Sequence, residues 1–420
     1  MQVSSLSGVI AIAGGNDHNL SVKSDGTVWA WGYNHYGRLG DGTTTDKHTP
    51  VQVSGLSGVI AIAGGTFHSL ALKSNGTVWA WGSNGFGQLG DGTTTERHTP
   101  VKVSGLSDVI AISVGNYHSL ALKSDGTVWA WGYNYYGQLG DGTNTEKDSV
   151  GKKTPVKVSR LSGVIAIAGG TYHSLALKSN GTAWAWGYNS YSQLGDGTTT
   201  DRNTPMQVGS ISGVTAIASG AYHSLALKSD GTVWAWGKNN AGQIGDGGTT
   251  GSGVYRETPV QVSSLSGITA IAGGYSHSLA LKSDGTVWAW GSNSWGQLGD
   301  GTEKDSNTPV QVSSINLGVT TTTPTPLSTP TPSSEKGSIS GDITDTEGNP
   351  IESAKIRLIG KRTKVSKRTT SDEDGFFEFT DLSADTYTIT ATRKGYKKGR
   401  QVITLGQGED ADIEIEMKKR

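Results

Sequence analysis

Short stretches of alternating apolar and polar residues recur along most of the chain. In one copy, residues 59–63 (VIAIA) are apolar, residues 68–73 (HSLALK) and 77–81 (TVWAW) alternate, and residues 100–104 (PVKVS) follow a glycine-rich loop. Asn75-Gly76, between the second and third stretches, is a strong signal for a tight hairpin. We therefore predict four short strands, named A to D in chain order, in this unit.

The same unit occurs six times. Trp-Ala-Trp-Gly starts at residues 29, 79, 129, 184, 234 and 288, which gives spacings of 50, 50, 55, 50 and 54 residues between successive copies. Twelve of the 13 tryptophans lie in these copies, so tryptophan belongs to the repeat. Four strands in each unit, repeated in tandem, predict an all-β fold: a β-propeller of six repeats, of the six- or seven-bladed type.

The paired tryptophans are expected in the core. Trp79 and Trp81 lie at positions i and i+2, so they share one face of strand C, and the small Ala80 faces the other way. A large residue on one side and a small one on the other suits sheets that stack face to face. We expect burial between neighbouring blades rather than a binding platform.

Ring closure has two possible forms. Residues 2–6 (QVSSL) repeat the pattern of residues 311–315 (QVSSI). The last blade could combine strands from both ends of the chain, which would remove exposed sheet edges. Alternatively, the sequence starts inside a repeat.

Composition excludes several functions. Lys+Arg 35 nearly balance Asp+Glu 36, so no polybasic surface is expected to bind nucleic acid. With no cysteine, disulfides and thiolate metal sites are excluded. The longest apolar runs have the length of a strand, so we expect no transmembrane segment. The N-terminus lacks the features of a signal peptide.

Residues 115–140 read Gly-x-x-His-Ser-Leu-Ala-Leu-x-x-Asp-Gly-Thr-Val-Trp-x-Trp-Gly-x-Asn-x-x-Gly-Gln-Leu-Gly. This pattern resembles the repeat of the regulator of chromosome condensation family, and the resemblance implies a propeller domain over residues 1–316. Members of that family include a nucleotide exchange factor for a small GTPase and a secreted bacterial inhibitor of β-lactamase. The resemblance therefore implies protein recognition. Nucleotide exchange stays an alternative, although the insertions at 146–153 and 247–257 are too short and polar to predict the inserted wedge that the exchange factor uses.

A second domain follows a Thr/Pro/Ser-rich linker at residues 317–336. Short alternating segments over residues 337–420 predict a small antiparallel β-sandwich of about seven strands. Residues 337–341 (GSISG), 348–351 (GNPI), 374–377 (DGFF) and Gly395-Tyr396 resemble the carboxypeptidase regulatory-like family, which implies a prealbumin-like accessory fold. The sequence contains no His-x-x-Glu zinc motif of a peptidase. Because such linkers are common in exported bacterial proteins, we expect an extracellular or cell-surface location.

No catalytic, metal or cofactor site is expected in the repeats. Each copy has one histidine at the same position, at residues 18, 68, 118, 173, 223 and 277. One histidine in each blade is spread around a ring, so we expect a structural hydrogen bond at each A–B turn rather than a converging site. Asp41, Asp91, Asp141, Asp196, Asp246 and Asp300 recur in Leu/Ile-Gly-Asp-Gly, where aspartate accepts local backbone hydrogen bonds in turns.

The best candidate for a binding site is one face of the propeller. Strands running up and down in turn place the A–B turns and the C–D loops at the same end of each blade. These loops vary among copies and carry the aromatic residues, whereas the B–C turns are nearly invariant. Aromatic side chains are enriched at binding hot spots. The predicted partner-binding residues are Tyr33, Tyr36, Phe67, Phe86, Tyr117, Tyr133, Tyr135, Tyr136, Tyr172, Tyr188, Tyr191, Tyr222, Tyr275 and Trp295.

We therefore expect a monomeric, non-catalytic protein that binds a protein partner. Binding of a carbohydrate, such as a cell-surface glycan, is the alternative, because sugars stack on aromatic rings. For Phe67, Tyr117, Tyr172 and Tyr222 a second role stays open, since A–B aromatics could instead fill gaps between blades.

Overall fold

The computed structural model describes residue 3 and residues 6–147, 149–209, 211–316, 337–347, 349–372, 375–405 and 410–419. The linker predicted at residues 317–336 lies outside the described residues, as do Gly348 and Asp374 of the second resemblance. The chain divides into two compact units, Met1–Thr321 and Thr322–Arg420. No helix in the described part is long and apolar enough to cross a bilayer.

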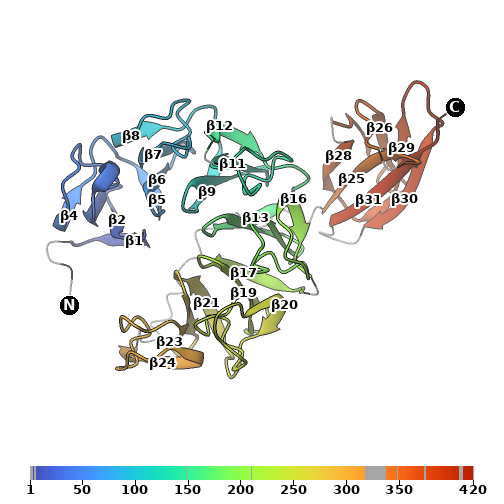
Figure 1. Cartoon of the computed structure of the whole chain (residues 1–420). Helices are drawn as coiled ribbons and strands as arrows, with labels where there is room; N and C mark the ends of the chain where they lie inside the picture. Colours follow the sequence, from blue (N-terminus) through green and yellow to red (C-terminus); the bar gives the residue numbers. More distant parts are fainter. Residues whose placement is uncertain are drawn as a thin grey trace. The chain divides into compact units, whose positions relative to one another are not determined.

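Six four-stranded sheets form the first unit, and each is built from consecutive strands of one repeat (Figure 1). Blade 1 contains β1 (Val9–Gly14), β2 (His18–Lys23), β3 (Val28–Gly32) and β4 (Lys47–Gln52), with a short 3-10 turn η1 (His35–Gly37); blade 2 contains β5 (Val59–Gly64), β6 (His68–Lys73), β7 (Val78–Gly82) and β8 (Arg97–Lys102); blade 3 contains β9 (Val109–Val114), β10 (His118–Lys123), β11 (Val128–Gly132) and β12 (Lys152–Lys157).

The later repeats follow the same plan. Blade 4 contains β13 (Val164–Gly169), β14 (His173–Lys178), β15 (Ala183–Gly187) and β16 (Arg202–Gln207); blade 5 contains β17 (Val214–Ser219), β18 (His223–Lys228), β19 (Val233–Lys238) and β20 (Tyr255–Gln261); blade 6 contains β21 (Ile268–Gly273), β22 (His277–Lys282), β23 (Thr286–Gly291) and β24 (Ser306–Asn316). The predicted propeller of six four-stranded repeats is confirmed. In blade 2 the last strand starts at Arg97 rather than residue 100, because Gly82 pairs with Arg97 across a bulge.

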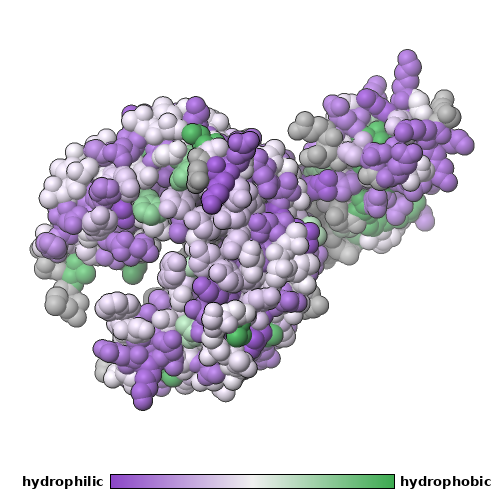
Figure 2. Space-filling view, in the orientation of Figure 1, coloured by the Kyte–Doolittle hydropathy of each residue, from purple (hydrophilic) through white to green (hydrophobic). Residues whose placement is uncertain are grey.

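The described residues leave the ring open between its first and last blades, and residues 2, 4 and 5 of the predicted closing segment lie outside them. β1 belongs to the sheet β1-β2-β3-β4 and β24 to the sheet β21-β22-β23-β24, so the described termini share no blade. Closure by a blade of mixed strands is therefore not what the described residues form. Figure 2 shows the gap, with hydrophobic residues at its border. On the blade 1 side, Ile12 is 79% exposed and Trp31 is only partly buried.

Each pair of neighbouring blades shares one apolar core. Between blades 1 and 2, Leu20, Val28 and Leu39 pack against Ala71 and Trp81. The equivalent second tryptophans of blades 2 to 6 are all fully buried: Trp81, Trp131, Trp186, Trp236 and Trp290. The first tryptophan of each pair is half-buried and lies beneath a lysine ammonium, for example Lys73 above Trp79 at 5.6 Å from the ring centre. Burial between blades is thus confirmed for the second tryptophan of these five blades.

A polar contact accompanies every one of these cores. The carbonyl oxygen of Arg38 accepts hydrogen bonds from the indole Nε1 of Trp81 at 2.8 Å and from the Oγ of Ser69 at 3.0 Å. Nε2 of His18 lies 2.9 Å from the same Ser69 Oγ. Because the serine hydrogen is used on the carbonyl, the imidazole must donate from Nε2. The same three contacts recur at the other four interfaces.

The repeated histidines are therefore structural, as predicted, but they join two blades instead of closing one turn. Burial lowers the pKa of His18, His68, His118, His173 and His223 to about 3. The Nδ1 atoms of these five rings are buried without a hydrogen-bond partner in the described structure, so a proton there would be unsatisfied. His277 in blade 6 makes no equivalent contact among the described residues.

The second unit contains seven strands in two sheets. They are β25 (Gly337–Asp345), β26 (Lys355–Gly360), β27 (Ser366–Thr370), β28 (Phe376–Leu382), β29 (Asp385–Thr392), β30 (Gly399–Leu405) and β31 (Asp410–Met417), ordered β28-β25-β31 and β27-β26-β29-β30. Ile343, Leu358, Phe377, Tyr387 and Ile389 lie in the core. The prediction that all strands are antiparallel was wrong for one pair, because β25 and β31 are parallel. Most of the domain separates these two strands, so no hairpin constrains their directions.

Replacing a fully buried indole should cost far more than replacing its partly buried equivalent beside the gap. We expect Trp81→Ala to lower the free energy of unfolding of the propeller by about 3–5 kcal/mol, because it leaves a cavity and removes one of the two hydrogen bonds to the Arg38 carbonyl. Trp31→Ala, at the same repeat position but beside the gap, should cost much less. Urea denaturation followed by circular dichroism measures both; equal losses would show that the gap is covered in solution.

Acidification should destabilise the propeller before its carboxylates titrate. The five buried histidines have folded pKa values below their unfolded value of 6.5, so their stabilising effect is complete above pH 6.5 and is lost as the pH falls toward about 3. We expect a lower urea midpoint at pH 5.0 than at pH 7.5. His118→Asn should reduce stability at pH 7.5 yet lose less on acidification. An unchanged pH slope in this variant would contradict the role of the ring.

Candidate binding face

The A–B turns and the C–D loops meet at the same end of the propeller. The ring of Tyr36, from a C–D loop, lies 6.1 Å from the ring of Phe67, from the A–B turn of the next blade. Phe86 and Tyr117 form the same type of pair at 5.3 Å, one blade further on. Strand direction alone predicted this arrangement, and these contacts show that the two loop classes are adjacent.

Aromatic rings form a continuous arc across this face. Each ring lies within 4.1–6.4 Å of the next, measured between ring centres, from blade 1 to blade 6. We call this arc the aromatic belt, and its members are Tyr33, His35, Tyr36, Phe67, Phe86, Tyr117, Tyr133, Tyr135, Tyr136, Tyr172, Tyr188, Tyr191, Tyr222 and Tyr275. Of the residues expected from the sequence, Trp295 alone lies outside the belt: it is 91% exposed and has no ring neighbour among the described residues.

The belt has an inner and an outer layer. Tyr133 is only 7% exposed, because the rings of Phe86, Tyr117 and Tyr172 surround it. Burial raises the pKa of Tyr172 to about 12, with neighbouring tyrosines contributing. Tyr33 and Tyr275, in contrast, are 44% and 60% exposed. The buried Tyr133 thus supports its neighbours and offers little surface, whereas the outer rings are accessible.

The A–B aromatics fill space between blades, which is one of the two roles that the sequence left open. Phe67 stacks on Tyr117 at 4.9 Å, and Tyr117 stacks on Tyr172 at 6.1 Å, so these half-buried rings fill the space between successive blades. Tyr222 continues the series toward Tyr275, 6.3 Å away. Their exposed edges still belong to the belt surface.

Two cations contact the belt, and neither was predicted from the sequence. The guanidinium carbon of Arg38 lies 4.9 Å from the ring centre of Tyr33 and 5.5 Å from that of Phe67, and its Nη1 donates to the Thr66 carbonyl. Burial lowers the pKa of Arg38, although Asp17 opposes this shift. Lys238 Nζ lies 4.8 Å from the ring centre of Tyr191. The available signal was that Arg38 stands where the other repeats have glutamine, but only the fold places it against aromatic rings.

A hydrogen-bond network holds each C–D loop in shape. In blade 2, Asn84 Oδ1 accepts from the Leu89 amide, and its Nδ2 donates to the Thr93 carbonyl. Asp91 Oδ1 accepts from the amide and hydroxyl of Thr93, and Arg97 contacts Oδ2 at 2.8 Å. Burial opposes ionisation of Asp91, but the hydrogen bonds from Thr93 outweigh it and lower its pKa. The turn role predicted for the repeated aspartates is confirmed by these contacts.

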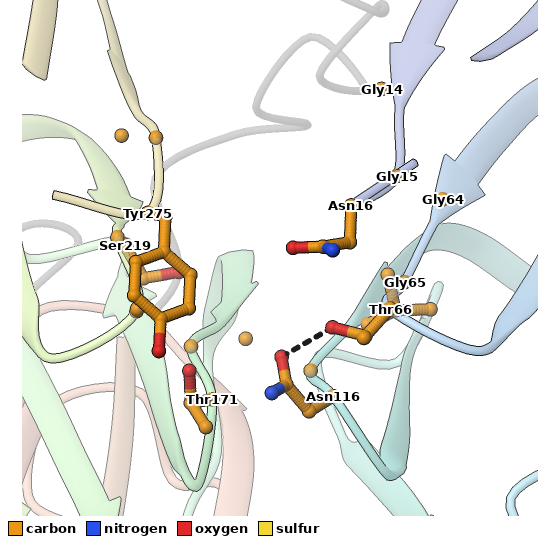
Figure 3. A pocket seen from close by; sticks show the side chains of 18 of the residues that line it. Gly14, Gly15, Asn16, Gly64, Gly65, Thr66, Asn116, Thr171, Ser219 and Tyr275 are labelled. Carbon is orange, nitrogen blue, oxygen red and sulfur yellow. Dashed lines mark hydrogen bonds between the residues drawn. The ribbon is translucent and has the colours of Figure 1, made fainter. Parts of the chain in front are cut away.

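The central channel opens among the A–B turns (Figure 3). Its volume is about 490 Å³, and its polar lining includes Asn16, Asn116, Thr171 and Tyr275. The blades converge so closely here that a Cβ on Gly15 would lie 2.6 Å from the Gly65 carbonyl oxygen, which explains the glycine at this repeat position. Tyr275 therefore belongs both to the channel lining and to the belt. Among the described residues, no group of three His, Asp or Glu side chains could hold a metal ion.

Comparison with known proteins agrees with this architecture. Residues 1–324 match the family model described as RCC1-like domain, and residues 338–418 match the carboxypeptidase regulatory-like domain. Two solved structures of the yeast protein RCC1 (Prp20) are similar. One, in complex with Kap60, is 27% identical with a TM-score of 0.65, covering 72% of this chain and 74% of that one. The other, studied with its binding to Gsp1p and histones, is 26% identical with a TM-score of 0.64, covering 72% and 76%.

A curated relative aligns over a shorter region. The ultraviolet-B receptor UVR8 of Arabidopsis thaliana is 31% identical over 171 residues, which is 39% of this chain and 38% of the receptor. The aligned segment thus spans well under half of that protein.

Proposed function

Because the chain belongs to the family of RCC1-like domains, we propose that it is a non-catalytic binding protein whose aromatic belt recognises a protein partner. The observation that carries the proposal is the unbroken series of ring contacts from Tyr33 to Tyr275 on one face. Large, stiff rings contribute contact area at little cost in conformational entropy. The hydrogen-bonded C–D loops hold these rings in place before a partner arrives, which reduces the cost of binding.

The charge pattern of the belt supports the same conclusion. Arg38 is 1% exposed and is paired with aromatic faces and main-chain carbonyls, so it stiffens the belt rather than forming a charged patch. The accessible surface therefore combines aromatic rings and polar loop atoms with isolated charges such as Asp17 and the half-buried Lys238, and aromatic rings are enriched at hot spots of protein interfaces. The similarity to yeast Prp20, whose solved structures concern binding to other proteins, agrees with this role.

A carbohydrate is the second candidate. The channel beside the belt is lined by amide, hydroxyl and main-chain groups, and Tyr275 joins the two surfaces. Rings for stacking beside uncharged hydrogen-bonding groups suit a neutral sugar.

Substitution of accessible belt residues tests the proposal. We expect Tyr33→Ser, Tyr135→Ser and Tyr275→Ser in one variant to weaken partner binding by at least about 30-fold, since hot-spot side chains contribute about 2 kcal/mol each. The melting temperature should change little, because the buried Tyr133 is retained. The partner is first identified by cross-linking in a lysate of the source organism and is then purified, so that its affinity is measured by calorimetry.

The matched control removes exposed apolar residues from the opposite end of the blades. Ile60 and Ile165 are 41% and 43% exposed near the start of strand A, and Ile60→Ser with Ile165→Ser should bind as the unmodified chain does. A purified partner that binds both variants equally well would refute the belt as its site. A glycan array tests the carbohydrate alternative, and a nucleotide-release assay with Gsp1p tests nucleotide exchange. If either assay gives a signal that the belt variant abolishes, that function takes the place of protein-partner binding.

A further inference from the structure

The second domain carries an unusual row of basic residues on one sheet. Across the strands β27-β26-β29-β30, Arg368 lies directly opposite Arg357, Arg357 opposite Thr390, and Thr390 opposite Arg400. In the neighbouring row, Lys355 is paired with Thr370 and Thr392. All three arginines and the lysine are exposed, and they share the face that points away from the core.

This arrangement costs stability. Like charges directly opposite each other on neighbouring strands repel. In the described part of the chain, no acidic side chain forms an ion pair with Arg357, Arg368, Arg400 or Lys355. Directly opposed arginines without a counter-charge suggest that an external anion bridges them.

The same face is hollowed. A cavity of about 660 Å³ lies over the sheet, and its lining includes Lys355, Arg357, Arg368, Thr390 and Lys398. This volume is within the range of small-ligand sites. The threonines place hydroxyl groups between the cationic groups, so the cavity alternates charged donors with neutral donors and acceptors.

We propose that this sheet face binds a linear anionic polysaccharide. Neighbouring strands lie about 4.8 Å apart, so the row from Arg368 to Arg400 spans three strand spacings, about 14 Å. A chain lying across the strands would meet a guanidinium on three of the four. The planar guanidinium group binds carboxylates and sulfates through two parallel hydrogen bonds. The hydroxyls of Thr390 and Thr370 are placed to pair with sugar hydroxyls.

The lining disfavours single-stranded nucleic acid. None of the residues that line the cavity is aromatic, so the bases would find no ring on which to stack. The site lies wholly in the second domain, so the test of this site is independent of the test of the aromatic belt.

Binding of defined glycans to the full-length protein tests this site. The probes are fluorescein-labelled oligogalacturonate, which bears carboxylates, and labelled neutral dextran, followed by fluorescence polarisation. We expect binding of the oligogalacturonate alone, weakening with added salt. Arg357→Gln with Arg368→Gln should weaken it at least about 10-fold, because charge-assisted hydrogen bonds are lost.

The control variant removes two exposed charges elsewhere. Lys361→Gln with Lys418→Gln has the same net charge as the arginine variant and should bind like the unmodified protein. The melting temperature of the arginine variant should not fall, since repulsion is relieved. Thr390→Val, which keeps every charge, should also weaken binding several-fold and provides a second test should the arginine variant fail to fold.

Several results would overturn the proposal. One is that the protein does not bind the oligogalacturonate. Another is that the arginine and lysine variants lose affinity equally. A third is that both the arginine variant and Thr390→Val keep the full affinity. Tighter arginine-dependent binding of single-stranded DNA or of anionic phosphatidylglycerol vesicles would assign the face to one of those polyanions instead.

Discussion

One contact between neighbouring blades underlies the whole propeller: a buried indole packs against the preceding blade and donates its hydrogen to a main-chain carbonyl there. The carbonyl that Trp81 uses belongs to Arg38, and Ser69 shares it, with His18 behind the serine. Arg38 lies in the C–D loop that also carries Tyr36. The contact that joins two blades therefore fixes the position of the loop from which the aromatic belt projects. The stability of the propeller and the recognition proposed for the belt therefore depend on the same few atoms.

The first and last blades show the effect of this contact, because each has only one of its two sides packed against a neighbouring blade. Blade 1 has Trp31 with its face partly open, and its polar Asn19 and Ser21 stand where blade 2 has Ser69 and Ala71. Blade 6 has His277, which is less deeply buried than the other five repeated histidines. In the interior the same residue types are fully enclosed. Burial here is a property of the interface between repeats, so an identical sequence motif has different solvent exposure according to its neighbours.

The repeat made the fold predictable, but it does not show how the aromatic rings of different blades contact one another. The repeat period, the hairpin turns and the alternation of apolar and polar residues define four strands in each unit. They also predict the end of the blade at which the aromatic residues lie, because strand direction follows from the local sequence. The inner position of Tyr133 depends on rings from three different blades or loops, among them Phe86 and Tyr172, and no local pattern contains that information. Arg38 was visible as a departure from the repeat, but its aromatic neighbours were not. In the second domain, strand alternation predicted the sandwich, whereas the parallel pairing of β25 with β31 joins the most distant strands in sequence.

The belt and the basic sheet face rest on different physical interactions, which has consequences for how the two units would work together. Contacts between aromatic rings and a partner depend on burial and respond weakly to salt, whereas the row of Arg357, Arg368 and Arg400 depends on charge and is screened within about 10 Å at moderate ionic strength. Because both surfaces belong to one chain, attachment of the second domain to an anionic polymer raises the effective concentration of the propeller beside anything held on that polymer. Such an anchor needs only modest affinity, since each bound partner then adds a second attachment. Together the two proposals describe a protein that selects its partner with the rigid aromatic face and is held in place by charge.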